Sequence, residues 1–150
     1  MNEPVDLVGV VLVAHGRLAL EMKEAAESIV GPIDRCAAVE VPPNLPLSGI
    51  RERVEAAIRS VDGDRGTLVL TDLFGGSPTN MCLSFLEEGK VDVLSGVTLP
   101  MLMKLSTSRR GKSLAQLSRL LRDYGRRHIV CASEVLAGRE RSGGTGAASR

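Results

Sequence analysis

The chain of 150 residues contains no tryptophan, and aromatic residues make up only 2% of it. A surface that binds single-stranded nucleic acid by stacking needs several aromatic side chains, so we do not expect one here. A formal net charge of +1 likewise creates no field that would recruit nucleic acid or an anionic membrane. These shortages argue against a nucleic-acid partner, and they require a core built from aliphatic side chains.

Cysteine is also scarce. The three thiols, Cys36, Cys82 and Cys131, are odd in number and widely spaced, and they include no CxxC pair. This pattern argues against a disulfide framework or a zinc site, and it indicates the reducing cytoplasm. The apolar run over residues 7–14 is too short to span a bilayer, and the acidic N-terminus does not resemble a signal peptide.

What the sequence does contain is a regular alternation of strand and helix patterns. Apolar runs rich in β-branched residues predict parallel strands buried on both faces, and helical periodicity separates them. The predicted strands cover residues 7–14, 36–41, 67–71 and 91–97, and the predicted helices cover 18–30, 48–61, 77–86, 100–106 and 113–124. We therefore predict an α/β fold, a doubly wound and mainly parallel sheet of four strands flanked by helices.

A fifth strand is predicted at residues 128–132. Residues 1–137 then form a single domain, and the Gly-, Ser- and Arg-rich residues 138–150 are predicted to be a disordered tail. We expect the first and third strands to be neighbours, with the second strand outside the first. That order creates a switch point between strands one and three, where open sheets of this kind bind ligands beyond the carboxyl ends of their strands.

Two side chains with chemistry follow these strands directly. His15 comes after the first strand and Asp72 after the third, so both are expected in the same crevice. A neutral imidazole offers one nitrogen lone pair for attack. A carboxylate that accepts a hydrogen bond from the other ring N–H fixes the tautomer and stabilises the ring as a bond forms. His15 and Asp72 are therefore the predicted catalytic residues.

The loop after the third strand supplies what an incoming phosphoryl group needs. Gly75 and Gly76 let the backbone approach closely. Serine is a preferred N-cap and proline is favoured at the first helical position, so Ser77 is the predicted N-cap of a helix whose free N–H groups attract anions. Gly16 leaves space beside the ring of His15. We predict that Gly16, Gly75, Gly76 and Ser77 bind phosphate.

Each of these features also has a purely structural interpretation. A histidine after a strand is more often structural than catalytic, Gly-Gly-Ser-Pro can form only a turn and a helix cap, and Asp72 can cap the following turn. The second histidine, His128, begins the predicted fifth strand away from the crevice, and we interpret it as structural. The convergence of His15, Asp72 and the glycine loop on one crevice favours a phosphoryl carrier.

Three blocks of the sequence resemble a known family. They are residues 13–16 (Val-Ala-His-Gly), 71–80 (Thr-Asp-Leu-Phe-Gly-Gly-Ser-Pro-Thr-Asn) and 95–102 (Ser-Gly-Val-Thr-Leu-Pro-Met-Leu). In order and spacing, the chain resembles the IIA component of the mannose/fructose/sorbose-type branch of the bacterial phosphoenolpyruvate sugar phosphotransferase system (PTS). The resemblance covers residues 7–136.

The resemblance implies a phosphotransferase with a phosphohistidine intermediate at His15, without a metal or an organic cofactor. Asp72 would hold the imidazole, and Ser77 would lie at the phosphate pocket. Such a protein accepts its phosphoryl group from the phosphocarrier protein HPr and passes it to a IIB component. It meets the membrane only indirectly, through IIC and IID partners. Family members are homodimers whose C-terminal strand crosses to the other subunit, which corresponds to residues 128–132 here.

Three other interpretations stay open at this point. A tetrapyrrole metal chelatase can also present His-Gly after a first strand, although it usually needs further metal ligands in the cleft. A non-catalytic sensor would bind a small anion at the helix start without forming a covalent adduct. The phosphocarrier subunit of a dihydroxyacetone kinase is a further relative. No motif names the sugar or the IIB partner, or decides between sugar uptake and its regulation.

Overall fold

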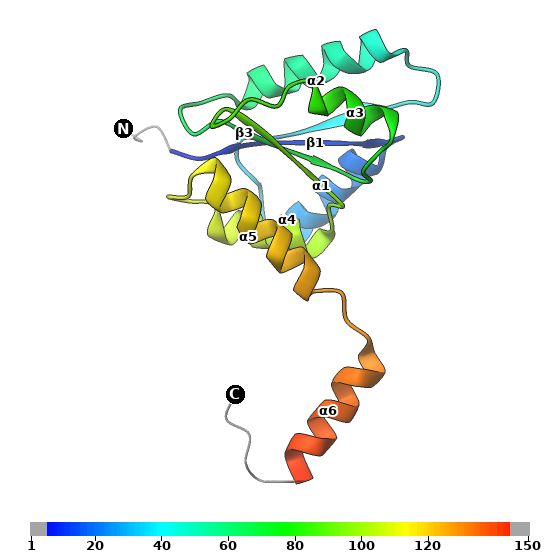
Figure 1. Ribbon diagram of the computed structural model, residues 1–150, viewed down its shortest axis with the longest axis vertical. Coiled ribbons are helices and arrows are strands. Elements are labelled where there is room, and N and C mark those ends of the chain that lie inside the picture. Colours follow the sequence, from blue (N-terminus) through cyan, green and yellow to red (C-terminus); the bar gives the residue numbers. More distant parts are fainter. Residues whose placement is uncertain (1–5, 145–150) are drawn as a thin grey trace.

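The fold is built on one parallel sheet. The computed structural model describes residues 6–144. Four strands pair in the order β2-β1-β3-β4, and all three neighbouring pairs are parallel (Figure 1). The strands are β1 (Gly9–His15), β2 (Cys36–Val41), β3 (Thr67–Thr71) and β4 (Val91–Ser95). The predicted strand order, with β3 beside β1 and β2 outside it, is therefore confirmed.

The central strand β1 shows why the sequence folds this way. Every residue of β1 is buried except the last, His15, because helices cover both faces of the sheet. A strand buried on both sides has no place for the polar residue of an alternating pattern, so it appears as a continuous apolar run. Full burial of one such Val or Leu side chain contributes about 1.5–3 kcal/mol. The run ends where the chain leaves the core, and that exit places His15 at the carboxyl edge.

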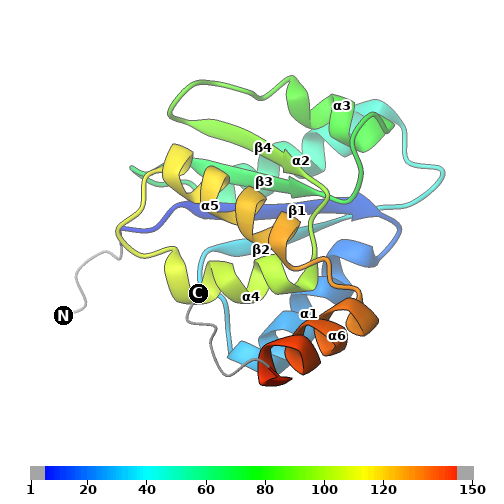
Figure 2. The same cartoon turned by 60° about the horizontal axis from the view of Figure 1, so that its bottom comes forward.

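Helices cover the two faces of the sheet in two layers. One layer holds α1 (Leu18–Val30), α4 (Leu99–Ser108) and α5 (Leu114–Arg127), which share an aliphatic core with one face of β1 and β3. The other layer holds α2 (Leu47–Val61) and the short α3 (Ser77–Leu83), which pack on the opposite face. Figure 2 shows the sheet between these two layers. The α/β class and the doubly wound layering agree with the prediction.

The amino edge of the sheet is fixed by a buried cation. Arg109, at the end of α4, is only 4% exposed. Its Nη1 donates to the carbonyl oxygens of Val8 at 3.2 Å and Arg35 at 3.4 Å, and its Nη2 donates to that of Asp34. Burial lowers the pKa of this guanidinium, but an arginine stays cationic in a protein. The side chain thus ties α4 to the starts of β1 and β2.

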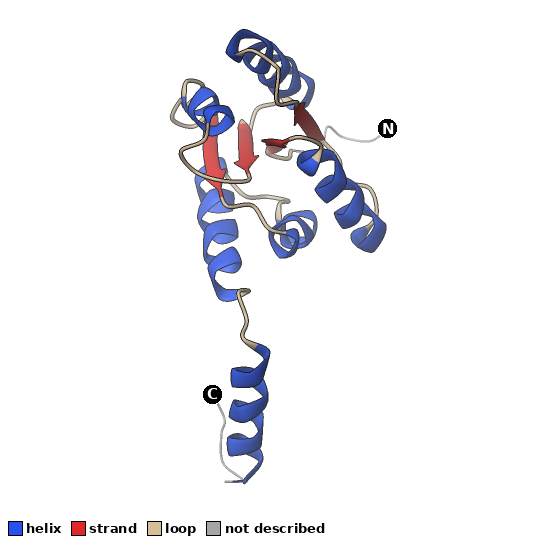
Figure 3. Ribbon diagram, turned by 90° about the vertical axis from the view of Figure 1, so that its right-hand side faces the viewer, coloured by secondary structure: helices blue, strands red, loops and turns tan. Residues whose placement is uncertain are grey.

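The C-terminal segment differs from the prediction of a fifth strand. Residues 128–131 belong to no strand, and α6 (Ala132–Gly144) begins at the next residue. Figures 1 and 3 show α6 standing clear of the sheet and its helices. A strand needs a neighbour to complete its hydrogen-bond ladder, and this segment has none among residues 6–144 of the single chain. The strand was therefore wrong for the isolated chain, while its exchange with a second chain stays a prediction.

The predicted disordered tail overlaps this helix. The backbone of residues 138–144 continues α6, and residues 145–150 lie outside the described residues. The single domain over residues 1–137 and the disorder of the tail thus stay predictions. Between residues 6 and 144, no helix combines the length and the apolar character needed to cross a membrane.

Candidate functional site: a histidine-aspartate pair at the switch point

The structure brings His15 and Asp72 together at the carboxyl edge. His15 Nδ1 lies 2.8 Å from Asp72 Oδ2, and the same oxygen accepts a hydrogen bond from the His15 backbone N–H at 3.1 Å. The pairing follows from topology, since β1 and β3 are parallel neighbours and their carboxyl ends lie side by side. An ionised carboxylate can only accept, so Nδ1 carries the hydrogen, and Nε2 of the neutral ring keeps its lone pair.

The two partners differ in exposure. The His15 side chain is 51% exposed, whereas that of Asp72 is only 12% exposed. Partial burial of Asp72 opposes ionisation, but hydrogen bonds from the His15 ring, the His15 backbone and the Leu73 backbone outweigh it. The pKa of the Asp72 carboxyl therefore lies below its ordinary value. A fixed, ionised carboxylate thus orients a ring whose outer nitrogen remains accessible.

One predicted glycine, Gly76, lies beside the ring of His15, and Gly75 turns the loop before it. A Cβ atom at Gly76 would stand 3.3 Å from His15 Cε1 and 3.7 Å from Nε2, so the backbone of Gly76 lies beside the outer edge of the ring. Gly75 has a φ of +91°, in the region that favours glycine, and turns the loop towards α3. A side chain at position 76 would crowd Leu73 and this edge of the ring.

Gly16 has a role in the fold that the sequence did not predict. Its N–H donates to Val41 O at 2.9 Å and its carbonyl accepts from Val41 N at 3.2 Å, which fastens the end of β1 to β2. Its φ of +57° turns the chain away from the strand immediately after His15. Gly16 therefore fixes the direction in which the chain continues after His15, and direct contact of Gly16 with a phosphate stays a prediction.

Ser77 lies one position deeper in its helix than predicted. Gly76, with an extended backbone, is the N-cap of α3, and Ser77 is its first helical residue. The predicted helix start and its proline are correct, but a glycine occupies the cap because the loop must pass close to the ring of His15. Ser77 is exposed, so its hydroxyl is accessible to a ligand at this edge.

Sequence reasoning missed one residue of this site, Thr79. It is fully buried in α3, and its hydroxyl donates to the carbonyl oxygen of Leu73 in the loop. In the sequence, a threonine just after a glycine-rich loop suggests a hydrogen bond to that loop. Only the fold shows that the acceptor is the carbonyl oxygen of Leu73.

Other reactive side chains do not join the site. Burial raises the pKa of Cys36 to about 11 and that of Cys82 to about 12, so both thiols stay protonated near neutrality. His128 caps the end of α5, where its Nδ1 lies 2.8 Å from Tyr124 O and its ring stacks on Tyr124. These contacts agree with a structural role for His128.

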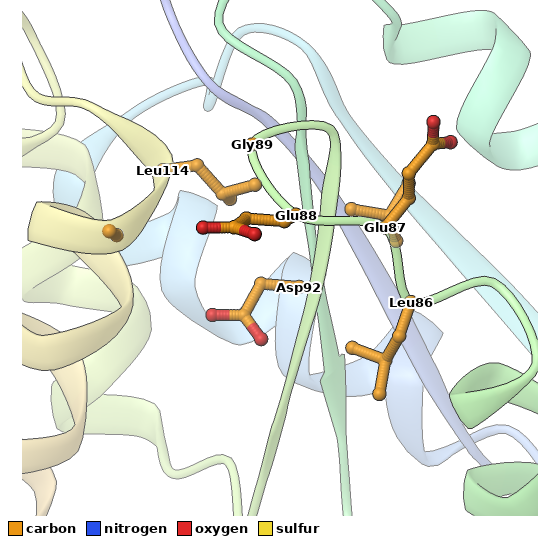
Figure 4. Close-up of a pocket in the computed structure, with 8 residues that line it drawn as sticks. Leu86, Glu87, Glu88, Gly89, Asp92 and Leu114 are labelled. Carbon is orange, nitrogen blue, oxygen red and sulfur yellow. The ribbon is translucent and has the colours of Figure 1, made fainter.

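An acidic pocket lies at the opposite edge of the sheet. Figure 4 shows Glu88 and Asp92 pointing towards Leu114 at the start of α5, whereas the carboxylate of Glu87 points away from them. This is the amino end of β4, whereas His15 and Asp72 lie at the carboxyl ends of their strands. Among the residues that the structure describes, no three His, Cys, Asp or Glu side chains gather as potential metal ligands.

The fold and the site together define a class of protein. It is an open, parallel α/β domain that presents a carboxylate-oriented imidazole at its switch point. The family model described as "PTS system fructose IIA component" matches residues 9–121, more than half of the chain. The chain therefore belongs to the IIA components of the mannose/fructose/sorbose-type PTS. Members of this family are phosphotransferases that carry a phosphoryl group on histidine.

Individual relatives agree with this assignment. The fructose-specific EIIA component of Bacillus subtilis is 27% identical over 131 residues, which cover 87% of this chain and 90% of the relative. The sorbose-specific EIIA component of Lacticaseibacillus casei is 31% identical over 109 residues, covering 72% and 78%. A solved EIIA structure from Streptococcus agalactiae superposes with a TM-score of 0.77 at 25% identity, covering 85% and 99%. The chelatase and anion-sensor alternatives are not favoured by these matches.

Proposed function

We propose that this chain carries the phosphoryl group on Nε2 of His15, receiving it from HPr and passing it to a IIB component. The observation that carries the proposal is the His15 Nδ1–Asp72 Oδ2 hydrogen bond of 2.8 Å. It engages the inner ring nitrogen and leaves the outer one as the nucleophile. The close approach of Gly76 to the Cε1–Nε2 edge supports a backbone cradle at the same nitrogen.

The proposed reaction is a displacement between two imidazoles. The Nε2 lone pair of His15 attacks phosphorus, and the bond between phosphorus and the donor's ring nitrogen breaks. That nitrogen takes back the electron pair. The ring of His15 becomes positively charged, and Asp72 stabilises that charge through Nδ1–H without removing the proton. Transfer onward to a IIB component reverses these steps with a new acceptor.

The loop from Gly75 to Ser77 supports the proposal from the phosphate side. The transferring phosphoryl group spreads its charge over its outer oxygens, and preorganised donors lower the barrier. The backbone N–H groups of Gly76 and Ser77 and the exposed Ser77 hydroxyl are the candidate donors. We propose that Gly75 and Gly76 allow this close approach.

Exposed apolar side chains at the same edge support a protein partner. Leu73 and Phe74 follow β3 and are exposed, and Phe74 is 74% exposed. Leu18 and Leu47, at the starts of α1 and α2, are exposed as well and follow strands that end at this edge. Apolar patches with polar surroundings are typical of protein-protein contacts. They suit a donor that brings its own histidine to an open site.

We also propose that the protein is a cytoplasmic homodimer in which residues 128–132 cross to the second subunit. The exposed apolar side chains of this region support the idea, since Ile129 is 82% exposed and Val130 is 60% exposed. Contact with the membrane would be indirect, through IIC and IID components. The role is in sugar uptake or its regulation.

The test is phosphorylation of the purified chain by phosphoenolpyruvate, enzyme I and HPr, followed by intact mass spectrometry under alkaline conditions. We expect one acid-labile phosphoryl group that disappears in His15→Ala and persists in the matched control His128→Ala. An adduct that survives His15→Ala, or no adduct on the unaltered protein, would contradict the proposal.

A further inference from the structure

The loop between Asp72 and α3 is held by few contacts. Phe74 points largely to solvent, Leu73 is half exposed, and the two glycines that follow have no side chains to pack. Such a loop has no intrinsic preference for the shape that brings Gly76 beside the ring of His15. Hydrogen bonds therefore supply much of what fixes its geometry.

Thr79 provides a bond of this kind from inside the protein. Its side chain is fully buried, and its hydroxyl donates to the carbonyl oxygen of Leu73, six residues earlier in the chain. A helical threonine commonly bonds to a carbonyl three or four residues earlier, within its own helix. Here the hydroxyl reaches across to the loop instead. A donor in a site closed to water holds its acceptor more tightly than one exposed to solvent.

This bond is linked to the nucleophile through the neighbouring peptide. The N–H of Leu73 donates to Asp72 Oδ1 at 2.9 Å, and the other carboxylate oxygen, Oδ2, bonds to His15. At the far end of the loop, Asn80 N donates to Gly76 O at 2.9 Å. The loop is thus fastened to α3 at both ends, and its first anchor is the Thr79 hydroxyl.

We propose that Thr79 is a positioning residue for phosphoryl transfer. Its buried hydroxyl holds Leu73 so that the Asp72 carboxylate stays aimed at Nδ1 of His15 and the Gly76 backbone stays beside Nε2. Thr79 touches neither the phosphoryl group nor the ring. This inference rests on the proposed function of His15, because the rate that it describes is that of transfer to this residue.

Two substitutions separate the hydroxyl from the packing of the side chain. Thr79→Val keeps the volume and removes the donor, whereas Thr79→Ser keeps the donor and removes a buried methyl group. We expect Thr79→Val to slow transfer from phosphorylated HPr about five- to tenfold, the factor that corresponds to one net hydrogen bond. The loss should appear in the single-turnover rate constant at saturating donor. Thr79→Ser should keep the rate within about twofold although it unfolds more easily.

A second measurement needs no phosphorylation. Amide hydrogen exchange of residues 73–77 should accelerate in Thr79→Val while exchange in β1 stays unchanged, and Thr79→Ser should restore slow exchange in the loop. A purely structural hydroxyl would instead lower the global stability, and the folded fraction would transfer at the normal rate.

The outcomes distinguish this inference from the function on which it rests. If the unaltered protein gains no phosphoryl group on His15, the proposed function fails and the inference fails with it. If the unaltered protein is phosphorylated but Thr79→Val keeps both the normal rate and the normal loop exchange, only the role of Thr79 is overturned. Equal losses in Thr79→Val and Thr79→Ser would also overturn it, because they would trace the effect to packing.

Discussion

The two edges of the sheet use polar side chains in opposite ways. At the amino edge, Arg109 is buried and donates to three backbone carbonyl groups. At the carboxyl edge, His15 is half exposed and uses only its inner ring nitrogen in the bond to Asp72. The first arrangement satisfies the polar groups of the fold, and the second leaves a nitrogen accessible.

The difference shows how one small sheet separates stability from chemistry. Removing Arg109 would break its hydrogen bonds to three backbone carbonyl groups, which costs stability. Altering His15 or its loop removes a group that faces water, so the fold should tolerate it. The amino edge therefore stabilises the fold, and the carboxyl edge carries the reactive side chains. The predictions below test that separation, starting with the largest effect.

Asp72→Asn should slow phosphoryl transfer to His15 roughly 100-fold, which is within the range of rate losses seen when an orienting or acid-base side chain is removed. The amide can donate to Nδ1 and so favour the tautomer whose Nε2 has no lone pair. The rate is measured by quenching the transfer from phosphorylated HPr at successive times and separating the phosphoprotein on gels at alkaline pH. Asp92→Asn, at the amino end of β4, is the matched control and should leave the rate unchanged. An undiminished rate in Asp72→Asn would remove Asp72 from the mechanism.

Arg109→Met should lower the free energy of unfolding by about 3 kcal/mol, because the fold loses the hydrogen bonds from a buried cation to the carbonyl oxygens of Val8, Asp34 and Arg35. Urea denaturation followed by circular dichroism measures this loss, and Arg110→Met is the control at an exposed neighbouring position. The folded Arg109→Met protein should still accept a phosphoryl group on His15. A specific loss of transfer without a loss of stability would mean that the two edges are coupled.

Phe74→Ser should raise the concentration of phosphorylated HPr needed for half-maximal transfer about fivefold, since an exposed apolar side chain at this edge would contact the partner. The maximal rate and the stability should change little, because Phe74 is mostly exposed. Leu86→Ser removes an exposed apolar side chain at the other edge and is the control. Equal effects of both substitutions would show that the docking surface is not confined to the carboxyl edge.

The smallest effect concerns acid stability. The folded-state pKa of Asp72 lies below its ordinary value of about 3.9, so its ionised form stabilises the fold fully above about pH 5. That contribution, about 1 kcal/mol or less, is lost as the pH falls through the folded-state pKa. The difference in unfolding free energy between the unaltered protein and Asp72→Asn should shrink over this acid range. A difference independent of pH would contradict the depressed pKa.

Particular residues mark where sequence reasoning succeeded and failed. Burial on both faces makes β1 a continuous apolar run, so the strand and the histidine at its end were readable from the sequence. The fifth strand was wrong for the isolated chain, because local β-branched residues at 129–130 give propensity but not a pairing partner. Ser77 was placed one position too early, because the preference of serine for the cap yielded to the need for glycine beside the ring of His15.

The sequence by itself determined the alternation of strands and helices, the parallel sheet, and the candidate pair of His15 and Asp72. These depend on local periodicity and on the rule that parallel strands present their carboxyl ends together. Only the tertiary structure decided which ring nitrogen Asp72 engages, how closely Gly76 approaches the other, and that Thr79 bonds to Leu73. Those facts depend on distances between segments separated in the chain, which no local pattern encodes.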